Sequence, residues 1–545
     1  DEDKTAKGDG TKKSKDGKGD EGEKAKSKEH LKIDFEGLAG RVSRVPVEAS
    51  NLGGLAAVKG HLLYVETGAP FYGRETPDKP VLHIFDLEER EASKLVEDLR
   101  GYALSSDGSK ILARQGSSYK LYDAKPKAAD PKTVDTKDMM VDRVPADEWA
   151  NIFDEVWRRY RDFFYVENMH GYDWQALGEQ YRQLLPHVAH RSDLNYVISE
   201  MIAELNIGHA YIEGGDFEIP PRPQVALPGA RFEADGASGR YRIAEIFRGH
   251  NEEPAYRSPL TAIGVDARVG EHVLAINGVE LTTAANPYRL LQHLSDPVKL
   301  TLNTAPSPEG ARTVTYDPVF SEDKLRYLDW VLDNLEYVDE ATGGRVGYLH
   351  IPDMSADGIA EFIKWFYPQI RKEGLIVDVR SNGGGNVSQI ILERLDNKVL
   401  GTRFGTFSDE PGTYPGVAFH GHMACLISET SASDGDIFPY YFRKLGLGPL
   451  IGKRTWGGVV GISGTGTLID GGTVFVPLNG SNSPDGEWIM EGHGVDPDIE
   501  VENDPRSLIA GRDPQLDRGI AEVMRKIEAE PKKLPERPAD PVKTK

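Results

Sequence analysis

The sequence predicts a multidomain α+β protein whose C-terminal part is an α/β sandwich. Three observations lead to this fold class. Short β-runs separated by turns fill residues 31–125, apolar residues recur at helical spacing over 146–205, and strands alternate with helices over 325–525. A period of two residues indicates strands and a period of three to four indicates helices. Alternation of the two is typical of a largely parallel sheet covered by helices.

Length and composition fit a soluble globular protein of about three to four domains. The 545 residues are 39% apolar and 28% charged, with a net charge of −22. A field of that sign repels phosphate, so we expect neither nucleic acid nor anionic membrane as a partner. No apolar run reaches the roughly 18 residues that would suggest a membrane span.

The single Cys425 favours a reducing compartment and hence the cytoplasm. Because the chain begins at Asp1, removal of an export signal stays open.

Residues 1–30 combine nine Lys with nine acidic residues among Gly, Ser and Thr. Such a segment cannot bury enough apolar surface to offset its chain entropy. We expect it to be disordered.

Residues 31–140 are predicted to form the C-terminal blades of a β-propeller. Their β-runs lie at 62–65, 81–85, 110–113 and 119–122. The stretch from Leu104 to Ala113, with its Ser-Asp-Gly turn, resembles the strand pair of TolB- and WD40-like propeller repeats. At most two blades fit this length, whereas a closed propeller needs about four to eight. A small free-standing sheet is the alternative.

Residues 141–220 are predicted to form a helical cap subdomain. Apolar side chains recur at three- and four-residue spacing from Trp149 to Tyr160 and again from Leu194 to Leu205. Gly208 ends the helical stretch, and His209 follows it on the way into a strand. On sequence grounds His209 is the best candidate for a general base.

Residues 221–322 are predicted to form a PDZ-like domain. The run from Gly270 to Leu281 resembles the strand–turn–strand of PDZ domains, with Asn277-Gly278 as the tight turn. We expect a helix over Ala284–Leu294. The resemblance implies binding of an extended peptide by strand addition. The alternative is a spacer with a closed groove, because the carboxylate-binding loop of PDZ domains is not legible here.

Residues 323–528 are predicted to form the α/β catalytic domain, and 529–545 a tail. Strands are expected at 345–351, 374–379, 423–427 and 448–451, and helices near 356–371, 387–395 and 434–445. In such sheets the active site lies at the carboxyl ends of the strands.

The strongest chemical motif is Ser431–Asp436, which follows the apolar run Met423–Ile427 and precedes an apolar helix. Ser433 would then lie at the carboxyl end of a strand and the amino end of a helix. Free N–H groups and the helix dipole stabilise a developing oxyanion at such a place. The alternative is a Ser/Asp helix cap without chemistry.

Two further motifs accompany the serine turn. A strand ending at Asp378 leads into Gly383–Gly385, whose N–H groups can approach a ligand closely. This suits an oxyanion hole, although a simple turn is the alternative. Glu491 and His493 lie next to a later Gly-Val turn.

The order of these motifs resembles the C-terminal half of tricorn-type proteases, within the family of C-terminal processing peptidases. The resemblance covers residues 31–525 and implies a serine peptidase that acts on oligopeptides and assembles into hexamers. It implies Ser433 as nucleophile, His209 as general base and Glu491 as the acidic member. The N–H of Asp434, with one from Gly384-Gly385, would form the oxyanion hole.

The chain departs from the family at two positions. Tricorn-type enzymes have a serine directly before the catalytic histidine, where this chain has Gly208, so a water or another hydroxyl would have to link Glu491 to His209. The processing peptidases use a Ser-Lys dyad, but Gly458 stands where that lysine would be. We therefore favour His209 as the base, and we expect no metal and no cofactor, because no His, Cys and carboxylate cluster has ligand spacing. Gly208 also keeps open a catalytically inactive peptide-binding or scaffold protein on the same fold.

Overall fold

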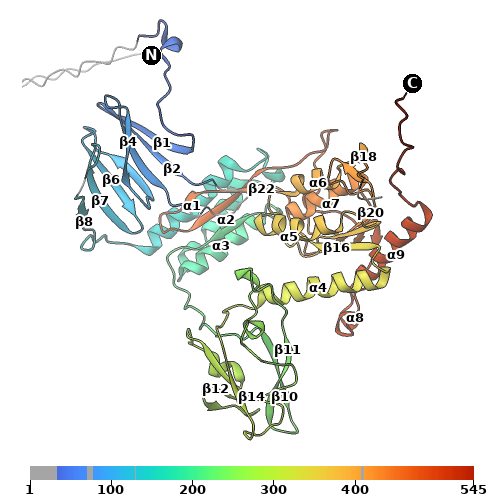
Figure 1. The fold of residues 1–545 in the computed structure, drawn as a ribbon. Helices are drawn as coiled ribbons and strands as arrows, with labels where there is room; N and C mark the ends of the chain where they lie inside the picture. The colour runs from blue at the N-terminus through green and yellow to red at the C-terminus, as the bar shows by residue number, and fades with distance from the viewer. Residues whose placement is uncertain (1–33, 70–75, 77, 129, 407–409, 545) are drawn as a thin grey trace, which may run out of the picture. The chain divides into compact units, whose positions relative to one another are not determined.

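The computed structural model describes residues 34–69, 76, 78–128, 130–406 and 410–544. The expectation of disorder for residues 1–30 lies outside these residues. The chain divides into two compact units, one ending at Lys137 and the other continuing from Asp138 to the C-terminus. Figure 1 follows the chain through both units.

The first unit consists of two four-stranded antiparallel sheets. The first holds β1 (Asn51–Val58), β2 (His61–Thr67), β3 (Val81–Asp86) and β4 (Glu91–Val96). The second holds β5 (Gly101–Leu104), β6 (Lys110–Gln115), β7 (Ser118–Asp123) and β8 (Lys132–Val134). The predicted Ser-Asp-Gly turn joins β5 to β6, where Asp107 Oδ1 accepts the Ser109 N–H at 3.0 Å. Two four-stranded meanders are what two propeller blades would provide.

The helical part of the second unit contains α1 (Pro145–Phe163), α2 (Trp174–Arg182) and α3 (Arg191–Ala203). The predicted apolar positions of α1 and α3 form one buried cluster. That cluster also includes Val474 and Val476, which the sequence had placed in the catalytic domain. They belong to a three-stranded sheet of β22 (Gly461–Thr467), β23 (Thr473–Asn479) and β9 (Tyr211–Glu213). The β22–β23 hairpin therefore packs against the helical domain.

The PDZ-like part is a six-stranded antiparallel sheet. Its strands are β10 (Ala230–Asp235), β11 (Arg240–Ile246), β12 (His272–Ile276), β13 (Val279–Glu280), β14 (Val298–Asn303) and β15 (Arg312–Tyr316). Asn277 and Gly278 both have positive φ, 49° and 81°, as the predicted tight turn requires. The expected helix at 284–294 is instead a short 3₁₀-helix, Pro287–Leu291, because the chain leaves the helix to pair Gln292 with Val225.

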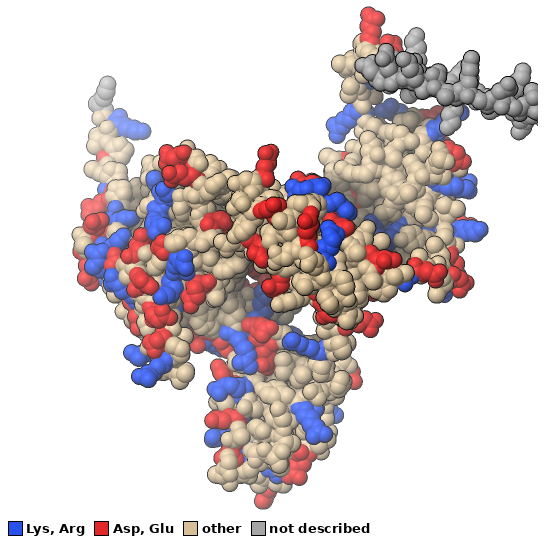
Figure 2. Space-filling model, turned by 180° about the vertical axis from the view of Figure 1, so that it is seen from behind, with Lys and Arg blue, Asp and Glu red and all other residues tan. Residues whose placement is uncertain are grey.

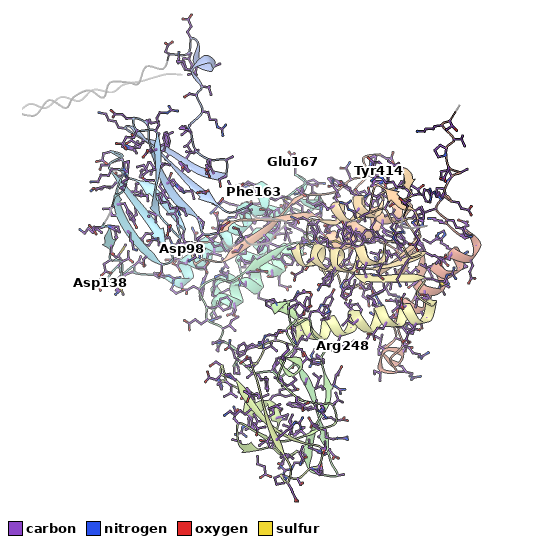
Figure 3. The ribbon with its side chains drawn as sticks, viewed as in Figure 1. Asp98, Asp138, Phe163, Glu167, Arg248 and Tyr414 are labelled. Carbon is purple, nitrogen blue, oxygen red and sulfur yellow. The ribbon has the colours of Figure 1, made fainter. Side chains whose placement is uncertain are left out.

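Arg248 connects this part to α4 (Asp323–Thr342) (Figure 3). Its guanidinium donates to the Asp329 carboxylate at 2.7 Å and to the Asp329 carbonyl at 2.9 Å.

The C-terminal part is the predicted α/β sandwich. Its sheet is entirely parallel, in the order β16 (Val346–His350), β17 (Gly374–Asp378), β20 (His422–Ile427), β21 (Leu450–Gly452) and β24 (Ile499–Glu500). A separate hairpin is formed by β18 (Gly401–Arg403) and β19 (Gly412–Tyr414).

Each face of this sheet has its own apolar cluster. One face packs against α5 (Ala356–Phe366), α6 (Ser388–Leu395) and α7 (Asp434–Lys444). The other packs against α4 and α9 (Pro514–Ala529), with α8 (Pro505–Ile509) preceding α9. Along β20 the side chains alternate between the two clusters, Cys425 facing the first and Leu426 the second. Both neighbouring strands β17 and β20 end at the same edge, and the candidate site lies there.

On the face that Figure 2 shows, Lys and Arg side chains are interspersed with Asp and Glu. No helix among the described residues combines the length and apolar character needed to cross a bilayer.

Candidate active site

Ser433 has a strained backbone at the junction of β20 and α7. Its φ of 59° and ψ of −122° lie in a region that non-glycine residues rarely occupy. Ser433 stands at the N-cap position of α7, yet its side chain makes no capping hydrogen bond. The alternative of a side-chain helix cap therefore does not describe this serine.

The two serines of the turn differ in their surroundings. Ser431 is fully buried, and its Oγ donates to the Val379 carbonyl at 2.8 Å. Ser433 is half-buried, and no other described residue hydrogen-bonds its Oγ. Ser431 thus holds the turn against the end of β17, while the Ser433 hydroxyl is left available.

The glycine turn after β17 lies directly against Ser433. A Cβ on Gly384 would come within 2.5 Å of the Ser433 Cβ and 3.1 Å of the Asp434 nitrogen, so only glycine fits. The Gly384 N–H donates to Asn382 Oδ1 at 2.9 Å. Within the described residues, the N–H groups of Gly385 and Asp434 have no hydrogen-bond partner. The Asp434 carboxylate is engaged elsewhere, accepting the Ser388 N–H at 2.9 Å at the start of α6.

His209 lies between α3 and β9, as predicted, and is 9% exposed. Its ring packs beside that of Trp456, with a centroid separation of 5.4 Å. Its buried Nδ1 has no hydrogen-bond partner among the described residues. Burial lowers the pKa of His209, and the negative charge of Glu491 partly opposes that shift.

Glu491 is held by three backbone N–H groups. Its Oε1 accepts the Gly208 N–H at 3.1 Å, and its Oε2 accepts those of Val459 and Val460 at 2.7 and 2.9 Å. Glu491 is thus joined to the residue directly before His209. Among the described residues Glu491 makes no hydrogen bond to the His209 ring itself, so a bridging water or hydroxyl between them stays a prediction.

Gly208 is a glycine for steric reasons. A Cβ at this position would lie 2.8 Å from the Gly458 Cα and 3.0 Å from the Trp456 ring. The serine found in the related motif would collide with the backbone here.

Residues 455–460, which we call the bridging loop, connect the serine turn to Glu491. The Thr455 N–H donates to the Val495 carbonyl at 3.1 Å, and the Trp456 N–H donates to the Ser431 carbonyl at 2.9 Å. The Gly457 N–H donates to Asp436 Oδ1 at 2.8 Å. Sequence reasoning used this stretch only to look for a lysine and missed its connecting role. Its glycines were the available signal.

The remaining basic candidates are engaged away from the serine. Lys453 pairs with Glu500 and Glu502 at 2.8 and 3.0 Å. His493 lies between Arg454 and Asp496, 2.7 Å from the Asp496 carboxylate, in an exposed turn. At position 458 a Cβ would come within 2.2 Å of the Trp456 ring, so no lysine fits there.

A pocket of about 540 Å³ between α6 and α7 begins beside the serine turn. Its lining residues are Asn386, Ser388, Gln389, Leu392, Glu393, Asp396, Asp434, Ile437, Tyr441 and Leu445. Leu392, Ile437, Tyr441 and Leu445 give the pocket its apolar wall, and the carboxylates of Glu393, Asp396 and Asp434 belong to the same lining.

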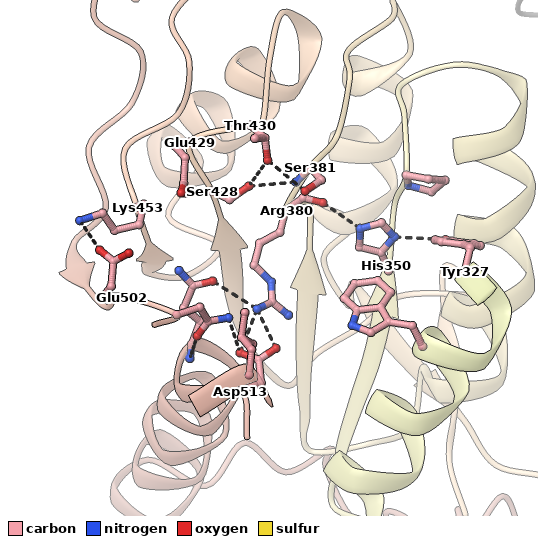
Figure 4. A pocket seen from close by; sticks show the side chains of 15 residues that line it. Tyr327, His350, Arg380, Ser381, Ser428, Glu429, Thr430, Lys453, Glu502 and Asp513 are labelled. Carbon is pink, nitrogen blue, oxygen red and sulfur yellow. Dashed lines mark hydrogen bonds and ion pairs between the residues drawn. The ribbon is translucent and has the colours of Figure 1, made fainter. Parts of the chain in front are cut away.

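A second pocket, of about 560 Å³, lies at the carboxyl ends of β16, β17 and β20, and neither Ser433, His209 nor Glu491 lines it. Figure 4 shows that most of its polar side chains are paired with one another. Arg380 pairs with Asp513 at 2.8 Å, and Ser381 Oγ lies 2.9 Å from Thr430 Oγ1. His350 bridges the Tyr327 hydroxyl and the Arg380 carbonyl. These contacts support the loops that precede Asn382 and Ser433.

The described residues contain no group of three or more His, Cys, Asp and Glu side chains placed to hold a metal ion.

Family models match three successive parts of the chain. The tricorn protease C1 domain matches residues 145–203, the tricorn protease PDZ domain 227–321, and peptidase family S41 345–501. Their order is that of the helical, PDZ-like and α/β parts.

Individual relatives match almost the whole chain. Tricorn protease homolog 1 of Streptomyces coelicolor is 36% identical over 521 residues, which are 92% of this chain and 48% of the relative. The tricorn protease of Thermoplasma acidophilum is 34% identical over 502 residues, 91% of this chain and 45% of the relative. A crystal structure of the tricorn protease superimposes with a TM-score of 0.80 at 31% identity, covering 89% of this chain and 47% of the other. The chain spans about half the length of these relatives.

Proposed function

Because this chain belongs to the tricorn family of serine peptidases, within peptidase family S41, we propose that it hydrolyses peptide bonds with Ser433 as its nucleophile. The observation that carries this proposal is the conformation of Ser433. Its φ of 59° holds the hydroxyl at the strand-to-helix junction without a hydrogen bond. An ordinary N-cap serine would instead accept a hydrogen bond from a backbone N–H in the first turn of the helix. Strain of this kind is characteristic of nucleophile turns in hydrolases.

His209 is the proposed general base. Its lowered pKa keeps the imidazole neutral near pH 7, the form that accepts a proton from a serine hydroxyl. The adjoining Trp456 ring and the burial of His209 limit water at the base.

Glu491 is proposed to orient His209 and to stabilise its protonated form. It does the first through the Gly208 N–H and the second through its charge. Its own position is supported by the N–H groups of Val459 and Val460.

The oxyanion of the tetrahedral intermediate is proposed to bind the Asp434 N–H and the turn at Gly384-Gly385. Because the Gly384 N–H is taken by Asn382, the Gly385 N–H is the better donor of the two. The α7 dipole adds to the stabilisation at Asp434.

The reaction then follows the covalent route of serine peptidases. Ser433 Oγ attacks the scissile carbonyl while its proton passes to His209. The C–N bond breaks as His209 gives that proton to the leaving amine, which leaves an acyl ester on Ser433. Water, deprotonated by His209, attacks the ester and releases the carboxylate product and free Ser433.

Oligopeptides are the proposed substrates. The pocket between α6 and α7 adjoins Asp434, so it is placed to receive a side chain next to the cleaved bond. Leu392, Ile437 and Leu445 suit an apolar stem, and Glu393 and Asp396 suit a cationic end.

Labelling by a fluorophosphonate, which reacts with activated serines, tests the proposal. We expect a single adduct on Ser433, none in Ser433→Ala, and a large loss of labelling and of peptide hydrolysis in His209→Ala. Correctly folded protein that binds peptides without labelling or cleaving them would favour the inactive scaffold instead. If His209→Ala keeps nearly full activity, the base is another residue.

Self-association into a hexamer and a cytoplasmic location also remain proposals. Light scattering of the purified chain tests the first, with a monomer mass as the result against it.

A further inference from the structure

Asp436 is a buried carboxylate three residues after Ser433. It is fully shielded from solvent in the first turn of α7, and its N–H donates to the Ser433 carbonyl at 2.8 Å. Its Oδ1 accepts the Gly457 N–H, whereas its Oδ2 makes no hydrogen bond of normal geometry among the described residues, although the nearby Thr455 hydroxyl helps to lower the pKa of the carboxyl. A fully buried carboxylate with one unpaired oxygen is costly, so its presence calls for a reason.

The bond from Asp436 to Gly457 fixes the centre of the bridging loop. On one side of Gly457, Trp456 packs on His209. On the other side, Val459 and Val460 hold Glu491, which in turn holds the Gly208 N–H. The contacts of His209 with Trp456 and of Gly208 with Glu491 therefore both depend on the bridging loop.

We propose that Asp436 is a positioning residue that docks the bridging loop onto the serine turn and so sets His209 relative to Ser433. This inference rests on the proposed function, because it assumes that Ser433 and His209 react together. It explains why a carboxylate is buried at this point: α7 carries both the Ser433 junction and the acceptor for the loop, so one rigid element positions both partners.

The acceptor oxygen, rather than the negative charge, carries this role. Glu491 is the charge that acts on the pKa of His209. Burial first, and then the charge of Glu491, raises the pKa of Asp436 to about 6, with Thr455, Gly457 and Ser433 as the groups that oppose the shift. A neutral side chain that keeps an oxygen at the Oδ1 position should therefore position the loop equally well.

Three substitutions separate these possibilities. Asp436→Asn keeps the acceptor and loses the charge. Asp436→Leu keeps a branched side chain, although a bulkier one, and loses the acceptor, and Asp436→Ala loses both the branched side chain and the acceptor. Asp498→Ala is the matched control, because Asp498 Oδ2 also accepts a backbone N–H at 2.8 Å, that of Leu450, outside the bridging loop.

The readouts are the rate of fluorophosphonate labelling, kcat and KM for a peptide, and the thermal midpoint. We expect Asp436→Leu and Asp436→Ala to lower the labelling rate and kcat by about tenfold or more, as the loss of one buried hydrogen bond allows, with KM changed less than about twofold. Asp436→Asn and Asp498→Ala should stay within about threefold of the wild type.

Two results would overturn the inference. One is wild-type labelling in a folded Asp436→Leu or Asp436→Ala protein. The other is a loss in Asp436→Asn as large as in Asp436→Leu, which would assign the role to the charge. Ser433→Ala separates this from the proposed function: if that variant still labels and cleaves like the wild type, the nucleophile assignment fails, whatever the Asp436 variants do.

Discussion

Glu491 Oε1 accepts a hydrogen bond from the backbone N–H of Gly208 at 3.1 Å. Gly208 directly precedes His209, so the carboxylate is coupled to the histidine through the main chain. A main-chain donor cannot rotate away as a serine hydroxyl can, and it leaves the position before the histidine free to be glycine. A glycine is needed at position 208, because the Gly458 Cα occupies the space where a Cβ would lie.

Replacing Glu491 by Gln should slow the proposed peptide hydrolysis and shift its pH profile. One oxygen of Glu491 would become an amide NH₂ facing N–H donors, so at least one of the three bonds is lost. Because the charge of Glu491 raises the pKa of His209, its removal lowers that pKa. We expect kcat to fall by about tenfold or more and the acid limb of kcat/KM to move to lower pH. Glu487→Gln, on the exposed part of the same segment, is the control. An unmoved acid limb would argue against Glu491 acting on His209.

Gly208→Ser, which restores the residue of the related motif, should reduce activity. The new Cβ would meet the Gly458 Cα at 2.8 Å and the Trp456 ring at 3.0 Å, and the Gly458 backbone cannot turn aside as the end of a flexible side chain can. We expect slower fluorophosphonate labelling and a lower thermal midpoint. Gly236→Ala serves as the control, because a Cβ there meets nothing within 4 Å. Increased activity in Gly208→Ser would mean that the loop moves to accept the hydroxyl.

The architecture could be predicted because its signals are local. The strand and helix periods gave the helical cap, the PDZ-like sheet and the parallel sheet, and the Asn277-Gly278 turn has the positive φ angles that its residues favour. Two covering helices, α4 and α9, were not predicted, although Asp513-Pro514 is a readable start for α9.

The internal connections of the site could not be predicted because they join distant segments through the backbone. The N–H of Gly208 bonds a side chain 283 residues later, and no side-chain type at position 208 announces that donor. The pairing of β23 with β9 places the hairpin that follows the bridging loop beside His209. The sequence of the β-run at 473–479 predicts a strand but does not indicate which strand it pairs with. The candidate residues of the site could be named from the sequence, whereas the hydrogen bonds that connect them could not.

Trp456→Ala should move the acid limb in the opposite direction to Glu491→Gln. The pKa of His209 is lowered mainly by burial, and Trp456 packs on its ring while remaining 45% exposed itself. Removing the indole admits water, so the pKa of His209 should rise toward its usual value near 6.5. The acid limb of kcat/KM should then rise with it. Trp488→Ala removes a more exposed indole, 62% accessible, that packs on Tyr165 instead, and should leave the limb unchanged. If the acid limb of kcat/KM instead moves to lower pH in Trp456→Ala, burial by this ring does not set the pKa of His209.

Asp436→Asn should stabilise the protein at neutral pH and not at acid pH. The pKa of Asp436 is raised to about 6 in the folded chain. Below about pH 4 the carboxyl is protonated whether the chain is folded or unfolded, so it costs nothing. Between about pH 4 and pH 6 the unfolded chain releases this proton while the folded chain still holds it. The free energy of unfolding therefore falls by up to about 3 kcal/mol once the pH has risen through 6. Asn carries no charge and escapes that loss. We therefore expect the thermal midpoint of Asp436→Asn to exceed that of the wild type by several degrees at pH 7.5 and to match it at pH 4. Equal midpoints at both pH values would mean that Asp436 ionises in the folded protein without penalty, and that water or a donor reaches its Oδ2.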